Sequence, residues 1–166
     1  MKTALCKVCQ VTGVLCPSCE RNLRSGVISQ LDVEISIFLG KETRNKKEFE
    51  NVQFKKALYI DNYLILIFKK GDLRIMLTHG RKIIRNLEKK FGKRVYLIED
   101  HPNFREFVES LLYPAPVEAI NIIWLPDGSK ETRIVLSKRL SKEKEELVKK
   151  IIKELRGIDV KVGYIR

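Results

Sequence analysis

The chain has 166 residues, of which 44% are apolar and 33% charged, and its net charge is +12 at pH 7. This composition is typical of a folded protein and excludes an intrinsically disordered chain. It contains neither an apolar run of the roughly 20 residues needed to cross a bilayer nor the apolar core of a secretory signal, so we expect a soluble, cytoplasmic protein with no membrane partner.

All four cysteines lie near the amino terminus, at Cys6, Cys9, Cys16 and Cys19. Two Cys-x-x-Cys turns separated by a short loop are typical of a tetrahedral Zn²⁺ site made of four thiolates. Metal binding also supplies the free energy that so short a segment cannot obtain from a core of its own. Four thiolates leave no open coordination position, so the zinc is expected to be structural. The alternative is a pair of disulfides, which some intracellular proteins of hyperthermophiles contain.

Two helices are predicted after the cysteines. The first covers residues 20–26 and ends at Gly26. The second begins at Ser29, which forms a capping box with Asp32 in place of the usual Glu. Apolar residues then recur at helical spacing as far as Leu39, so this helix is expected to run into the 40s. We therefore predict a zinc-binding segment over residues 1–27, followed by a helix that leads the next unit.

The apolar pattern changes to that of strands after residue 55. Residues 56–60 and 63–68 are predicted to pair as a hairpin around the turn Asp61-Asn62. A helical turn opens at residues 71–72, a polar break follows at residues 78–81, and residues 82–91 predict a second helix that ends at Gly92. Residues 94–98 predict a third strand. Residues 28–100 thus have the order helix, strand, strand, helix, helix, strand.

The rest of the chain nearly repeats this order. Helices are predicted over residues 102–112 and 142–155, and strands over residues 117–124, 131–136 and 158–165. Trp124 stands at the end of a strand and is expected to pack there; the alternative is an exposed anchor for a partner. The stretch KKFGKRVYLI at residues 89–98 is echoed by KELRGIDVKVGYI at residues 153–165. This is a weak internal repeat with a period of about 65 residues.

The segment from Gly71 to Ile98 resembles the first KH domain of archaeal NusA-like proteins, and residues 102–165 are similar to the second. The resemblance implies an α+β fold with two KH units of type II, at residues 28–100 and 101–166. It also implies a GxxG loop between two helices that holds about four nucleotides of single-stranded RNA. That loop falls on Thr78-His79-Gly80-Arg81. The zinc segment lies outside the family pattern.

The loop departs from the family pattern because Thr78 and Arg81 replace its outer glycines. Their loss should loosen the backbone clamp, and Arg81, Lys82 and Arg85 are expected to pair with phosphates instead. Residues 53–101 carry 12 basic and 5 acidic side chains, a net charge of +7. A solvated helix face is the alternative explanation for this charge. The predicted RNA-binding residues are Thr78, His79, Gly80, Arg81, Lys82, Arg85 and Lys89.

In the second unit the corresponding slot falls near residues 143–146. Its acidic side chains, Glu143, Glu145 and Glu146, would repel phosphate. These residues are expected to continue a helix and to be inert towards RNA.

No catalytic pattern of nucleophile, base or phosphate loop occurs, so we expect neither an enzyme nor a small-molecule substrate. The resemblance implies an RNA-binding factor in transcription elongation or termination, with single-stranded RNA and RNA polymerase as partners. The alternative is a protein-docking module on RNA polymerase or the ribosome that has lost RNA binding.

Overall fold

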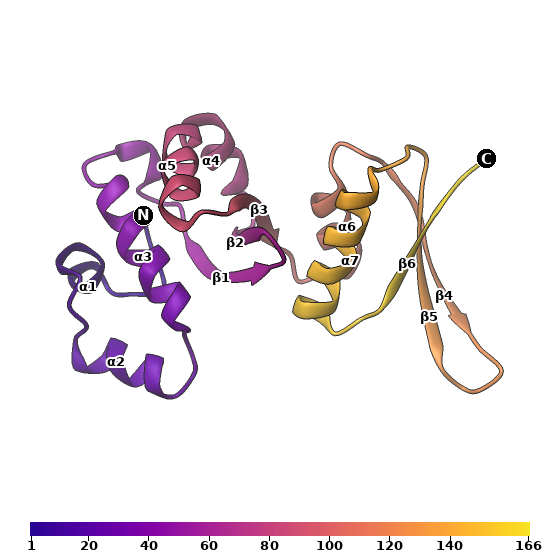
Figure 1. The fold of residues 1–166 in the computed structure, drawn as a ribbon, viewed down its shortest axis with the longest axis horizontal. Coiled ribbons are helices and arrows are strands. Elements are labelled where there is room, and N and C mark those ends of the chain that lie inside the picture. The colour runs from indigo at the N-terminus through magenta and orange to yellow at the C-terminus, as the bar shows by residue number, and fades with distance from the viewer. The chain divides into compact units, whose positions relative to one another are not determined.

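The computed structural model describes residues 1–166, which divide into two compact units, Met1–Asp100 and His101–Arg166. Each unit combines helices with a three-stranded sheet of its own, so the fold class is α+β (Figure 1). None of the helices combines the length and the apolar character that crossing a membrane requires.

The first unit holds most of the secondary structure. Its elements are α1 (Lys7–Thr12), α2 (Pro17–Arg24), α3 (Gln30–Glu42), a short 3-10 helix η1 (Lys47–Phe49), β1 (Phe54–Ile60), β2 (Tyr63–Lys69), α4 (Leu73–His79), α5 (Arg81–Phe91) and β3 (Arg94–Asp100). The sheet has the order β1-β2-β3, in which β1 and β2 are antiparallel and β2 and β3 are parallel.

The predicted hairpin and the predicted start of α3 are confirmed. Ile60 pairs with Tyr63 across the two-residue turn, and Asp61 adopts the left-handed conformation, with φ 51°, that such turns require. The Ser29 side chain accepts the Asp32 N–H, and the Asp32 carboxylate accepts the Ser29 N–H, as a capping box demands.

One core lies between the sheet and helices α3, α4 and α5. Leu64, Leu66 and Phe68 alternate along β2, so their side chains point to the same face of the sheet, and all three are fully buried in this core. The helices contribute the remaining core side chains, which include Ile35, Leu39, Met76, Ile83 and Leu87. The helical residues of α4 and α5 are therefore fixed by the same core as the sheet.

The cysteine segment packs onto α3 and belongs to the first unit (Figure 1). Leu5, Cys9 and Cys19 form a small second cluster with Ile28 and Val33. The backbone of Lys2 also exchanges two hydrogen bonds of 2.8 Å with Val52 and Phe54. This segment is thus held both by its own cluster and by the main sheet.

The helices around the cysteines differ from those predicted. The helix expected over residues 20–26 begins earlier, at Pro17, and α1 was not predicted at all. The reason is local: each Cys-x-x-Cys starts a helix, with Cys6 and Cys16 as the N-cap residues and Pro17 at the first helical position, where proline is favoured.

The second unit has fewer helices than the first. It consists of α6 (Phe104–Leu112), β4 (Val117–Trp124), β5 (Lys130–Leu136), α7 (Lys142–Arg156) and β6 (Val160–Tyr164). Its sheet repeats the pattern of the first, with the order β4-β5-β6 and a final parallel pair. A single helix joins β5 to β6, where two helices join β2 to β3, and residues 143–146 lie in its first turns as predicted.

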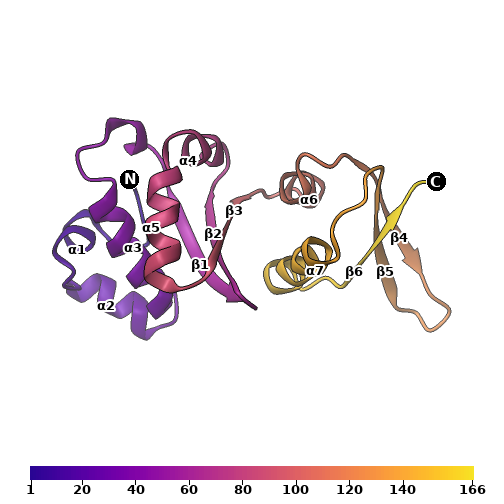
Figure 2. The ribbon, with the colours of Figure 1, turned by 45° about the horizontal axis from the view of Figure 1, so that its top comes forward.

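Trp124 is exposed, contrary to the expectation that it packs at the strand end. Its side chain is 67% exposed, and Lys130 Nζ lies 4.5 Å from the centre of its ring. In both views the β4–β5 hairpin extends beyond α6 and α7, so these helices do not cover its tip (Figures 1 and 2).

Candidate metal centre and nucleic-acid interface

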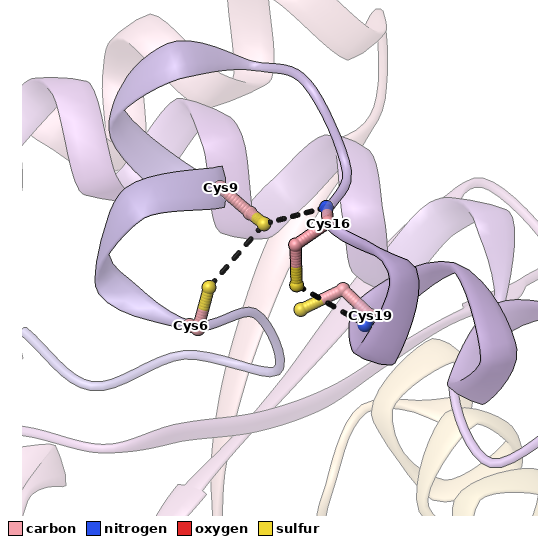
Figure 3. A group of neighbouring side chains, drawn as sticks. All are labelled: Cys6, Cys9, Cys16 and Cys19. Atoms are coloured by element: carbon pink, nitrogen blue, oxygen red, sulfur yellow. Dashed lines mark hydrogen bonds between the residues drawn. The ribbon is translucent and has the colours of Figure 1, made fainter.

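The four cysteines are placed by two helix starts. Cys6 and Cys16 precede α1 and α2, and Cys9 and Cys19 lie in the first turn of each helix. The Cys16 N–H donates to Cys9 Sγ at 3.1 Å, and the Cys19 N–H donates to Cys16 Sγ at 3.4 Å (Figure 3). Backbone amides therefore already stabilise negative charge on the sulfurs, as in many thiolate metal sites.

The sulfur atoms are close enough together to share one metal ion. All four lie within 4.8 Å of one another, and none forms a disulfide (Figure 3). Tetrahedral zinc with Zn–S bonds of about 2.3 Å requires sulfurs about 3.8 Å apart. Cys9 and Cys19 are buried, whereas Cys6 is exposed. Geometry and donor chemistry thus fit a four-thiolate zinc site.

The thiols of Cys16 and Cys9 have pKa values shifted in opposite directions. The Cys19 backbone N–H and the neighbouring thiols lower the pKa of Cys16 to about 7. For Cys9, the Cys16 N–H lowers the pKa, but burial and the adjacent sulfurs outweigh it and raise the pKa to about 12. Without a cation the cluster thus carries its negative charge unevenly. A divalent ion would stabilise all four thiolates together.

The predicted loop between α4 and α5 is much shorter than expected. Thr78 and His79 are the last residues of α4, and Arg81 is the first residue of α5, so the break expected at residues 78–81 reduces to Gly80. Gly80 has φ −99°, which any residue can adopt. A glycine is nevertheless required at this position, because an added Cβ would lie 2.7 Å from the Met76 carbonyl oxygen. The backbone is therefore tightly packed at Gly80, on the side where a Cβ would lie.

The exposed side of α5 carries cations without acidic partners. Arg81, Lys82, Arg85 and Lys89 are all exposed, and none of them forms an ion pair. Arg81, Arg85 and Lys89 recur every fourth residue and so share one side of the helix. No acidic residue occupies the first turn, and no side chain caps it. Its free N–H groups add to the positive potential at that end.

Glu88 places one acidic side chain next to these cations. Its carboxylate accepts the Val95 N–H at 3.1 Å and so ties α5 to β3. The basic residues in the second half of α5 and directly after it also differ in position. Arg85, Lys89, Lys93 and Arg94 line a hollow of about 550 Å³, together with Asn62 and Glu88. Lys90 points elsewhere, with its Nζ 5.3 Å from the Phe38 ring of α3.

The predicted RNA-binding residues thus fall into two groups. Thr78, His79, Gly80, Arg81 and Lys82 lie at the α4–α5 junction, and Arg85 and Lys89 lie farther along α5, at the hollow. The sequence did not predict the hollow, or that Asn62 lines it, because both depend on the distance between the hairpin turn and the end of α5. No sequence signal reports that distance.

Comparison with known proteins points to one group of transcription proteins. No protein-family model matches the chain. A "Probable transcription termination protein NusA" from Methanococcus vannielii is 27% identical over 60 residues, which are 36% of this chain and 35% of that protein. The protein of the same name from Methanocaldococcus jannaschii is 26% identical over 74 residues, 45% of this chain and 40% of its own. The chain thus spans well under half of these relatives, which support a NusA-like relationship.

A solved structure described as "Crystal structure of APE1850" has a similar fold. It aligns with a TM-score of 0.53 at 21% identity, over 63% of this chain and 79% of that chain. This likeness concerns the fold alone.

Proposed function

We propose that the chain is a non-catalytic, RNA-binding transcription factor of NusA type, which contacts single-stranded RNA through its first KH-like unit and associates with RNA polymerase. The order of helices and strands and the partial similarity to archaeal NusA proteins support this proposal. The observation that carries it is the row of unpaired cations on α5.

The mode of contact proposed here differs from a glycine-loop clamp. Thr78 and Arg81 stand where a GxxG loop has its outer glycines, so the backbone has less freedom to approach a phosphate closely. Arg81, Lys82, Arg85 and Lys89 instead present flexible cations along about 12 Å of α5. Such side chains bind the RNA backbone by charge, and they make binding strongly dependent on salt.

The four cysteines are proposed to bind one structural Zn²⁺. The ion would cross-link the starts of α1 and α2 and so stabilise the segment that packs on α3. It would take no part in RNA contact. Four thiolates satisfy a tetrahedral ion completely, so no position remains for a substrate.

The experiment is a salt titration of binding between single-stranded RNA and a variant that carries Arg81→Ala, Lys82→Ala and Arg85→Ala. We expect at least a tenfold loss of affinity and a slope of log K against log salt that is flatter by roughly 2, since each phosphate contact contributes about 0.7 on a single strand.

The matched control removes the same charge elsewhere in the first unit, by Arg21→Ala, Arg24→Ala and Lys56→Ala. These exposed residues lie on α2 and β1, outside the α5 face. If the control weakens RNA binding equally, binding is diffuse attraction by a basic protein. If the intact protein binds no RNA even at low salt, the protein-docking role is the better account.

A further inference from the structure

A second hollow, of about 590 Å³, lies between α1 and the carboxyl end of α3. None of the residues that line it belongs to α4, to α5 or to the four cysteines. The hollow is thus separate from both sites described above, and its size is that of a small-ligand site.

The lining of this hollow is strongly basic. Lys7, Arg44, Lys46 and Lys47 contribute four cations, and Glu50 is the only acidic residue among the lining residues. None of the four cations forms an ion pair or a side-chain hydrogen bond. Cations that outnumber the acidic residues around a concavity create a focused positive potential, which favours an anionic ligand.

The walls of the hollow are built by the fold. On one side, α3 ends at Thr43, and Asn45 reverses the chain with φ 63°, so that Arg44, Lys46 and Lys47 follow one another around the rim. On the other side, α1 is fixed closely against α3, because a Cβ at Gly40 would lie 3.0 Å from Gln10.

Gln10 itself stabilises the position of α1 at this hollow. It is 5% exposed, and its side-chain amide donates to the Met1 carbonyl while its oxygen accepts from Thr3. The position of Lys7, one turn earlier on α1, is therefore set by buried contacts rather than by its own side chain.

The chemistry of the lining indicates what the hollow recognises. It includes no aromatic residue, so it offers no surface on which a base could stack. Its cations and the amide of Asn45 suit the oxygens of a phosphate. We propose that this hollow is a phosphate-binding site, whose ligand is supplied either by the backbone of RNA or by a small free phosphate compound. The proposal does not depend on RNA binding by α5.

The test uses the full chain and two probes. Sodium pyrophosphate is titrated while the amide NMR signals of Gly40, Thr43 and Asn45 are followed, and fluorescein-labelled single-stranded RNA is titrated by fluorescence polarisation. The hollow variant carries Arg44→Ala, Lys46→Ala and Lys47→Ala, all at exposed positions. The control variant carries Arg21→Ala, Arg24→Ala and Lys56→Ala, which remove equal charge outside the hollow.

We expect saturable shifts at the three amides and a Kd for pyrophosphate that the hollow variant raises by roughly tenfold or more, with little change in the control. An accompanying loss of RNA affinity identifies the RNA backbone as the source of the phosphate, whereas unchanged RNA affinity identifies a small free phosphate compound. The proposal is overturned if pyrophosphate causes no saturable shift, or if the control variant weakens binding as much as the hollow variant. Neither result depends on the α5 variants, so the two proposals can fail separately.

Discussion

Gly80 packs directly against the backbone of Met76, since an added Cβ would lie 2.7 Å from the Met76 carbonyl oxygen. We predict that Gly80→Ala distorts the end of α4 and lowers the free energy of unfolding by about 1–3 kcal/mol, as overpacking does. Urea unfolding measures this change. The matched control is Gly163→Ala, because Gly163 also has an ordinary φ and has no atom within 4 Å of an added Cβ. Equal stability of the two variants would contradict the packing argument.

The Asp32 carboxylate joins the start of α3 to the edge of the sheet. It accepts the Ala57 N–H at 2.7 Å and the Ser29 N–H at 2.9 Å, and the residue is 3% exposed. Asp32→Asn replaces one acceptor with an NH₂ group that faces a donor, so we predict a loss of about 1–3 kcal/mol in urea unfolding. Glu34→Gln, at an exposed position on the same helix, should change stability little. Similar losses in both variants would exclude a specific role for Asp32.

One Zn²⁺ per chain is predicted from the four-thiolate cluster, and elemental analysis measures it. Cys16→Ser should abolish metal binding and remove hydrogen-exchange protection from α1 and α2, while Ser18→Ala in the same turn should do neither. Protection of β2 and α5 should survive, because their core is distinct from the cluster around Cys9 and Cys19. Protein that contains no metal and only oxidised cysteines would instead indicate disulfides.

Alkylation of the metal-free, reduced protein should depend on pH in a residue-specific way. Cys16, with a pKa of about 7, becomes a thiolate as the pH rises through 7, so its rate with iodoacetamide should increase from pH 6 to 8 and then level off. Cys9, with a pKa of about 12, stays protonated and should react slowly throughout this range. Peptide mass spectrometry separates the two sites. Equal rates, with a common midpoint near the ordinary thiol pKa of about 8.5, would mean that the segment unfolds without metal.

The acidic start of α7 is predicted to have a structural role and no role in RNA binding. Glu145 accepts a hydrogen bond of 2.9 Å from the Tyr164 hydroxyl and pairs with Lys149 at 3.3 Å. Glu145→Ala should therefore lower stability by roughly 1 kcal/mol, since it removes this tie to β6, and it should leave RNA affinity unchanged. Glu146→Ala, which removes the same charge from a more exposed side chain, is the control. A marked loss of RNA binding in either variant would contradict the assignment.

Local interactions explain which features could be predicted from the sequence. The capping box of Ser29 and Asp32, the turn at Asp61 and the gathering of the four cysteines all depend on residues a few positions apart. Their geometry follows from backbone preferences and short-range hydrogen bonds. The same local rules place Arg81, Arg85 and Lys89 on one side of a helix.

The tertiary structure alone decided how distant residues meet. The sequence gives no sign that Lys7 shares a hollow with Arg44 and Lys47, or that Lys90 turns away from Lys89 towards Phe38. The exposure of Trp124 also depends on where α6 and α7 end relative to the β4–β5 hairpin (Figure 2). These properties arise from the packing of helices on sheets, in which each contact depends on the volume and position of side chains far away in the chain.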